Sequence, residues 1–145
     1  MASIGDIPVR VEGVASAQEL GNAWPILSEI RHALARLIET GEPTQIDLSA
    51  MPFGPGDEAR LLSLLGTGEV TATVDALGPS QIRETAFRGV WVVEYQSTEA
   101  QRVALHIEID TVPQLLRTHP DDLADGLAAL DERLAAGEQR DRFDA

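Results

Sequence analysis

The chain has 145 residues, 43% of them hydrophobic, with 24 acidic and 11 basic side chains, a formal net charge of −13 and no cysteine. This length fits one domain with a core of its own, and the acidity argues against nucleic acid or an anionic membrane surface as a partner. Without cysteine the chain has no disulfide and no thiolate to act as a nucleophile or to hold zinc or an iron–sulfur cluster.

The N-terminal residues, 1–15, are interrupted by glycines and hold one short alternating run, which predicts a partly ordered segment. They lack a basic region followed by an apolar run, so no signal peptide is expected. No apolar run anywhere in the chain is long enough to span a bilayer. A cytoplasmic protein is therefore expected, with a single α+β domain over 16–137 that opens on a capping box at Ser16 and Glu19.

Three segments in the first half have clear local signals. Residues 25–40 carry apolar side chains on one helical face, with Pro25 in the first turn and Gly41 as the expected stop. A short strand is predicted over 44–49. A second helix is predicted over 57–66, ending at a glycine.

After Gly68 the apolar period changes from helical to two, which predicts strands over 69–77, 81–87, 90–95 and 102–110. Short turns join them, which is typical of an antiparallel meander with one covered face. In the last strand one row is expected to point inward: Val103, Leu105, Ile107 and Ile109. The element order predicts an α+β fold, a mainly antiparallel sheet of four to five strands with helices packed on one face.

The C-terminal part returns to a helical period. Over 120–137 the leucines fall on one face: Leu123, Leu127, Leu130 and Leu134. The last residues, 138–145, have no such pattern, and a frayed tail is expected. The two tryptophans, Trp24 and Trp91, are expected to fill the core and the sheet faces.

The octapeptide 51–58, MPFGPGDE, has two interpretations. As a helix entrance, its Pro–Gly pair positions the chain, Asp57 caps the helix and Glu58 complements the helix dipole. That interpretation leaves Met51 and Phe53 unexplained. They belong either to the core or to an apolar knob that contacts a partner.

Catalytic and metal sites find less support. His106 and Glu108 lie two apart on a strand and so on one face, but two further metal ligands would have to come from elsewhere. A solvated strand face is the default interpretation. Asp57 and Glu58 form an acid–base pair only if a cleft raises the pKa of one of them, and no serine has the setting of a nucleophile.

Four segments occur in the order MPFGPGDE, GEVTATV, ETAFRGVW and HIE. Together they resemble the C-terminal conserved region of the HupH family, also called HyaF, the nickel–iron hydrogenase expression and formation proteins. The resemblance runs from about Leu48 to Leu130. Members of that family tend to be longer than this chain.

The resemblance implies a non-catalytic accessory protein, and no cofactor is expected. It implies a chaperone that binds the iron–sulfur-bearing small-subunit precursor of the hydrogenase before assembly and export, and that works with other maturation factors. Binding is expected through the 51–58 turn and the adjoining sheet. The expected apolar contacts are Met51, Phe53 and Trp91, and the expected polar contacts are Asp57, Glu58 and Glu84.

Four further hypotheses come from the residues themselves. The acidic surface suits a basic element of the precursor, such as a twin-arginine leader, and a sheet edge suits an extended client segment. The alternative function is a metal-binding or carboxylate-dependent enzyme domain that uses His106 and Glu108 with Asp57 and Glu58. A third possible function, after the chaperone and the enzyme domain, is an oligomer-forming module such as a homodimer.

Overall fold

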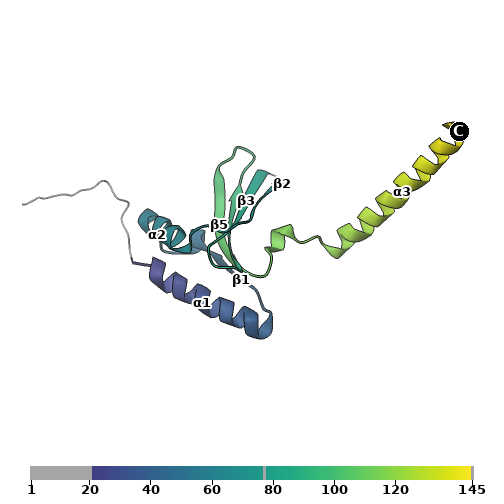
Figure 1. Ribbon diagram of the computed structural model, residues 1–145. Coiled ribbons are helices and arrows are strands. Elements are labelled where there is room, and N and C mark those ends of the chain that lie inside the picture. The colour runs from purple at the N-terminus through teal and green to yellow at the C-terminus, as the bar shows by residue number, and fades with distance from the viewer. Residues whose placement is uncertain (1–20, 77, 145) are drawn as a thin grey trace, which may run out of the picture. The chain divides into compact units, whose positions relative to one another are not determined.

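The computed structural model describes residues 21–76 and 78–144, so the predicted N-terminal segment and the capping box at Ser16 lie outside the described residues. The chain divides into two compact units, one up to Leu115 and one from Leu116 onward. The first unit holds all five strands and the first two α-helices (Figure 1). Within the described residues, no helix is both long and apolar enough to cross a membrane.

The first helix, α1 (Ala23–Thr40), begins two residues before the predicted start and ends where predicted. Pro25 still lies in the first turn, where a missing N–H costs no helical hydrogen bond. Gly41 closes the helix in the left-handed conformation with φ of 77°, and its N–H donates to the carbonyl of Leu37. A glycine meets this backbone requirement without the steric strain that a Cβ would add.

The next elements are β1 (Thr44–Asp47), the short 3-10 helix η2 (Leu48–Ala50) and α2 (Pro55–Leu65), which ends at the predicted glycine. The strand is shorter than predicted because the Asp47 carboxylate accepts a hydrogen bond of 2.9 Å from the N–H of Ser49. That contact starts the 3-10 turn and ends the ladder.

The four predicted strands of the meander are present, but the second lies three residues earlier in the chain than the predicted range 81–87. Their bounds are β2 (Thr71–Ala76), β3 (Gly78–Glu84), β4 (Val90–Gln96) and β5 (Arg102–Ile109). The sheet has the order β1-β5-β4-β3-β2, with every neighbouring pair antiparallel. The α+β prediction is therefore confirmed, with β1 as the fifth strand beside β5 and β2 at the opposite edge.

The main core lies between the two helices and one face of the sheet. Its buried side chains come from α1, from α2 and from the central strands β4 and β5, and they include Ile30, Leu61, Val92, Ile107 and Ile109. The predicted inward row of β5 is right for three residues and wrong for Val103, which is 66% exposed. The β4–β5 register shifts at this point, with Tyr95 opposite Ala104 and Gln96 opposite Arg102, so Val103 is the extra residue of a β-bulge and leaves the inward row.

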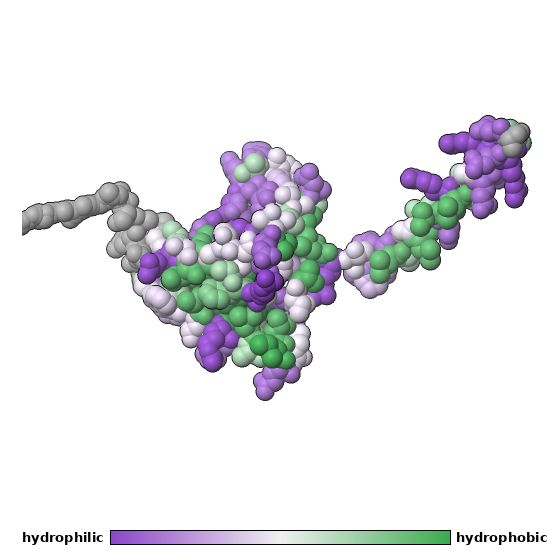
Figure 2. All heavy atoms as spheres, viewed as in Figure 1, coloured by the Kyte–Doolittle hydropathy of each residue, from purple (hydrophilic) through white to green (hydrophobic). Residues whose placement is uncertain are grey.

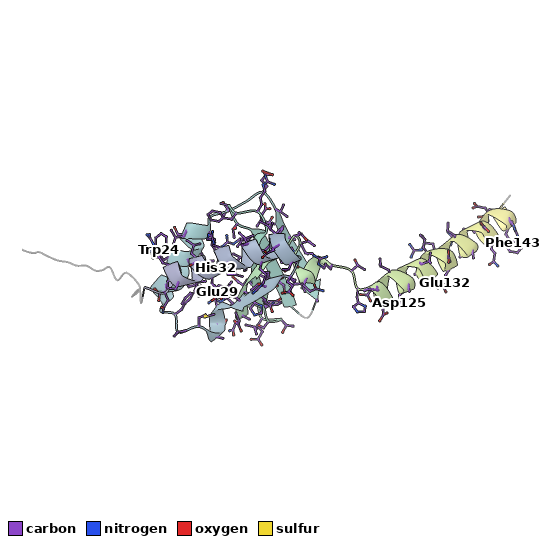
Figure 3. The ribbon with its side chains drawn as sticks, turned by 90° about the horizontal axis from the view of Figure 1, so that it is seen from below. Trp24, Glu29, His32, Asp125, Glu132 and Phe143 are labelled. Carbon is purple, nitrogen blue, oxygen red and sulfur yellow. The ribbon has the colours of Figure 1, made fainter. Side chains whose placement is uncertain are left out.

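The tryptophans have different surroundings. Trp91 is buried in β4, but Trp24 is 58% exposed, so its prediction as a core residue is wrong. Trp24, Glu29 and His32 project from the exposed side of α1 (Figure 3). The helix turns Ala23 and Ile26 inward, and Trp24 falls outside that buried stripe.

The second unit is a single long helix, α3 (Pro120–Asp144), preceded by the 3-10 turn η3 (Gln114–Leu116). The helix continues through the stretch for which a frayed tail was predicted. Glu, Gln and Arg are good helix formers, so this stretch needs no apolar periodicity to stay helical. Its leucines are all exposed.

Candidate functional site

The octapeptide forms a tight entrance to α2. The N–H of Met51 donates to the carbonyl of Leu48 at 3.3 Å, and the N–H of Phe53 donates to the carbonyl of Met51 at 2.8 Å. Gly54 then adopts an extended conformation as the residue before the helix, and Pro55 is the first helical residue, the position where its fixed φ suits the helix. These contacts fix where Met51 and Phe53 lie.

Asp57 is fully buried at the start of α2. Its carboxylate accepts hydrogen bonds from the N–H groups of Gly54 at 3.2 Å, Gly21 at 3.0 Å and Asn22 at 3.4 Å. The predicted capping role is therefore confirmed, and it extends to the residues just before α1. The amide of Asn22 also donates to the carbonyl of Pro52 at 2.8 Å. Asp57 thus joins the starts of both helices and has no exposed surface to offer a partner.

The neighbouring acid, Glu58, points outward. Its carboxylate accepts two hydrogen bonds of 2.8 Å from the guanidinium of Arg102, the first residue of β5. The two side chains are 27% and 41% exposed respectively. The hydrogen bond to Glu58 is the main cause that raises the pKa of Arg102 above its ordinary value. This bidentate geometry fixes the position of both side chains.

A surface pocket of about 350 Å³ lies beside this ion pair. Its lining residues are Leu48, Ser49, Met51, Phe53, Gly54, Glu58 and Arg102. Met51 and Phe53 are partly buried and pack against the main core. The core role considered from the sequence is therefore confirmed for both residues, and both also line the pocket.

The remaining predicted contacts, Glu84 and Trp91, are buried and have internal partners. The Glu84 carboxylate accepts a hydrogen bond of 3.1 Å from the N–H of Glu69. The Trp91 indole N–H donates to the carbonyl of Asp110 at 3.1 Å. The two residues face each other in the β3–β4 register, on the sheet face opposite Val90 and Val92. Of the six predicted contacts, the pocket brings together Met51, Phe53 and Glu58.

Sequence reasoning missed Arg102, Ser49 and Leu48 as lining residues. Arg102 lies 44 residues from Glu58, and nothing local connects the two. The usable signal is an arginine at the start of a strand and an acid in the first turn of a helix. That signal becomes specific only once the docking of α2 against β5 is known.

The alternative site around His106 is a hydrogen-bonded network on the sheet face opposite the helices. Gln45 lies 2.8 Å from the His106 ring nitrogen and donates to Glu108 at 3.3 Å. Glu108 also accepts from the N–H of Gln114 at 3.2 Å and is only 4% exposed. The expected solvated face is therefore wrong at this position. Tyr95 packs edge-on against His106 with ring centroids 5.0 Å apart.

Within the described residues, no three His, Asp or Glu side chains are arranged to hold a metal ion. Asp47 lies 3.7 Å from His106 but belongs to the polar network around it. Asp57 and Glu58 do not share a cleft either, since one is enclosed by backbone N–H groups and the other is paired with Arg102.

Similarity to known proteins covers most of the chain. The family model described as "HupH hydrogenase expression protein, C-terminal conserved region" matches residues 20–137. The hydrogenase expression/formation protein HoxQ of Azotobacter vinelandii is 30% identical over 89% of this chain and 50% of its own length. The hydrogenase-1 operon protein HyaF of Escherichia coli is 26% identical over 87% of this chain and 41% of its own length.

A solved structure agrees in fold. The hydrogenase expression protein HupH from Thiobacillus denitrificans is 43% identical and matches with a TM-score of 0.79, covering 82% of this chain and 99% of that one. The chain spans half or less of the length of the two curated relatives above. The resemblance noted in the sequence is thus confirmed, and the chain belongs to the HupH hydrogenase expression protein family through its C-terminal conserved region.

Proposed function

We propose that this chain acts in nickel–iron hydrogenase maturation as a non-catalytic binding protein, and that it holds the small-subunit precursor before assembly and export. Its relatives are named hydrogenase expression/formation proteins, which supports the maturation role. The observation that carries the binding role is the pocket at the entrance of α2. Acting on a precursor before export, the protein would work in the cytoplasm.

The pocket suits a protein segment better than a reaction. Its volume of about 350 Å³ is at the lower end of the range found for ligand pockets, roughly 300–1,000 Å³. It offers apolar walls from Leu48, Met51 and Phe53, with a charged pair at the edge. An apolar client side chain would enter the pocket while its neighbours reach Glu58 and Arg102. Such an arrangement matches interfaces in which a buried anchor is surrounded by polar contacts.

The net charge of −13 supports a client segment that carries positive charge, because complementary charge speeds and orients association. A twin-arginine leader has this chemistry. β2 is the sheet edge opposite β1, so an extended client segment could also add to it. The sequence also suggested a homodimer. Its interface would involve α3 and would not include the pocket.

Capture of the purified small-subunit precursor tests the proposal. Phe53→Ala should weaken binding at least tenfold, because it removes an apolar wall of the pocket. Phe87→Ala is the matched control, since Phe87 is 47% exposed in the β3–β4 turn and does not line the pocket. Glu58→Arg changes the charge of the same pocket without removing core packing. Both pocket variants should lose binding while the control keeps it.

Unfolding curves of each variant separate lost binding from lost folding. Equal capture by the wild type and by a folded Glu58→Arg variant would reject the pocket as the site. Absence of capture by the wild type would reject the precursor as the client. A precursor without its leader provides a further comparison, because unchanged affinity would remove the leader from the proposal and leave the pocket in place.

A further inference from the structure

The helix α3 has an apolar face that its own unit cannot cover. Leu123 and Leu127 are each 62% exposed, and Leu130 and Leu134 are each 58% exposed. Apart from Leu116, the last residue of η3, α3 is the one element in the described part of this unit. No second element within the unit can therefore pack on the leucines. Figure 2 shows hydrophobic side chains gathered along the middle of α3. An amphipathic helix obtains most of its stability from packing such a face.

The spacing of the leucines specifies the kind of packing. They follow one another at intervals of four, three and four residues, which is the alternation of the a and d positions in a heptad repeat. With Leu127 and Leu134 at a, the d positions are Leu123, Leu130 and Gly137. Two acids on α3, Asp125 and Glu132 (Figure 3), then fall at f, the side farthest from the stripe.

Opposite charges flank the two sides of the stripe. The e positions hold Asp131 and Glu138, and the g positions hold Arg133 and Arg140. In a parallel coiled coil, a g residue of one helix faces the e residue of the following heptad of the other, which brings Arg133 opposite Glu138. An antiparallel pair instead sets e against e and g against g, so like charges would oppose one another. The e and g charges of a coiled coil set partner choice and orientation.

We propose that α3 pairs with α3 of a second copy of this chain as a short, parallel, in-register coiled coil. The leucines form the seam, and Arg133 pairs with Glu138 of the partner subunit on both sides. The inference goes beyond the proposed hydrogenase function and does not depend on it, because the surface lies in a different unit from the pocket. With only two heptads of leucine, the dimer should dissociate on dilution.

Sedimentation equilibrium over a range of concentrations tests the dimer. The wild type should show a reversible monomer–dimer equilibrium. Leu127→Glu should be monomeric at every concentration, because it places a charge in the seam. Ala128→Glu is the matched control, with the same added charge one residue along at a b position, and it should keep the wild-type equilibrium. A monomeric wild type would overturn the proposal and indicate that the stripe packs within one chain or on another protein.

Charge reversal tests the pairing. Arg133→Glu should raise the dissociation constant of the dimer by roughly tenfold, since it replaces two attractive pairs with two repulsive ones. The double variant Arg133→Glu/Glu138→Arg should restore wild-type affinity. Arg133 and Glu138 are five residues apart and do not face each other on one helix. If α3 packed only within its own chain, the double variant would therefore not restore the wild-type behaviour. A double variant as weak as the single one would overturn the assigned pairing.

A single introduced cysteine tests the orientation, because the chain has none of its own. Gly137→Cys places a thiol at the d position that ends the stripe, where an added Cβ meets nothing within 4 Å. A parallel pair should form a disulfide-linked dimer on mild oxidation. The matched control Ala135→Cys, at an outer b position, should not. A dimer by mass without a disulfide at 137 would reject the parallel arrangement.

Discussion

Arg102 and Glu58 join the first residue of β5 to the first turn of α2 through two hydrogen bonds of 2.8 Å. The pair forms the polar wall of the pocket, with Met51 and Phe53 on the apolar side. Glu58 also lies near the positive end of the α2 dipole, which favours its charge. The Glu58 side chain therefore stabilises the start of α2, holds the start of β5 against it and lines the candidate site.

This pair should contribute a small but measurable coupling. In a double-mutant cycle with Glu58→Gln and Arg102→Gln, we expect a coupling free energy of about 0.5–1 kcal/mol at low salt, because both side chains keep part of their surface in water. The coupling should fall as salt rises. Urea unfolding of the four proteins at two salt concentrations measures it.

A second ion pair in the same protein is the control. Arg88 and Glu69 lie 3.5 Å apart, with side chains 80% and 79% exposed. The same cycle on this pair should give no measurable coupling. Equal coupling energies for the two pairs would show that bidentate geometry and partial burial add nothing at the pocket.

Asp57 should be important for stability rather than for binding. Asp57→Ala leaves the N–H groups of Gly21, Asn22 and Gly54 without their carboxylate acceptor. We expect the free energy of unfolding to fall by about 1–3 kcal/mol, and Asp57→Asn to cost less because it keeps one acceptor oxygen. Chemical denaturation measures both. Asp75→Ala, at an exposed position of β2, is the control, and an equal effect there would contradict the structural role of Asp57.

Local signals predict most of the fold. The stops at Gly41 and Gly66 are visible in the sequence because each helix ends at a glycine that the backbone geometry requires. The alternation of apolar and polar residues along 102–110 identifies β5 and its inward residues near the middle of the sheet. It fails at Val103 because the β4–β5 register shifts there: Tyr95 pairs with Ala104 and Gln96 with Arg102, so Val103 is the extra residue of a β-bulge.

The site is harder to predict because it depends on contacts between distant segments. Asp57 and Glu58 are adjacent, but one turns toward Gly21, 36 residues earlier, and the other toward Arg102, 44 residues later. Neither direction can be read from composition or periodicity. Glu84 shows the same limit, since a glutamate in a strand suggests exposure but here accepts a backbone N–H and is 8% exposed.

Tyr95 offers a direct test of the polar face of the sheet. Partial burial, and after it the nearby charge of Glu108, raises the pKa of Tyr95 above its ordinary value of 10.0. The chain has a single tyrosine, so the near-ultraviolet absorbance of tyrosinate reports on this residue alone. An alkaline titration of the folded protein should have its midpoint above 10.0, the ordinary value. Glu108→Gln should lower the midpoint but keep it above that value, because burial remains.

The same shift predicts how stability depends on pH. Above the ordinary pKa of 10.0 the unfolded chain releases the tyrosine proton while the folded protein still holds it, so the folded state binds more protons. Stability must then fall as pH rises from that value through the folded pKa. Unfolding free energies measured across this range should fall less steeply for Tyr95→Phe than for the wild type. Identical slopes, or a titration midpoint at or below that of the urea-unfolded chain, would contradict the environment assigned to Tyr95.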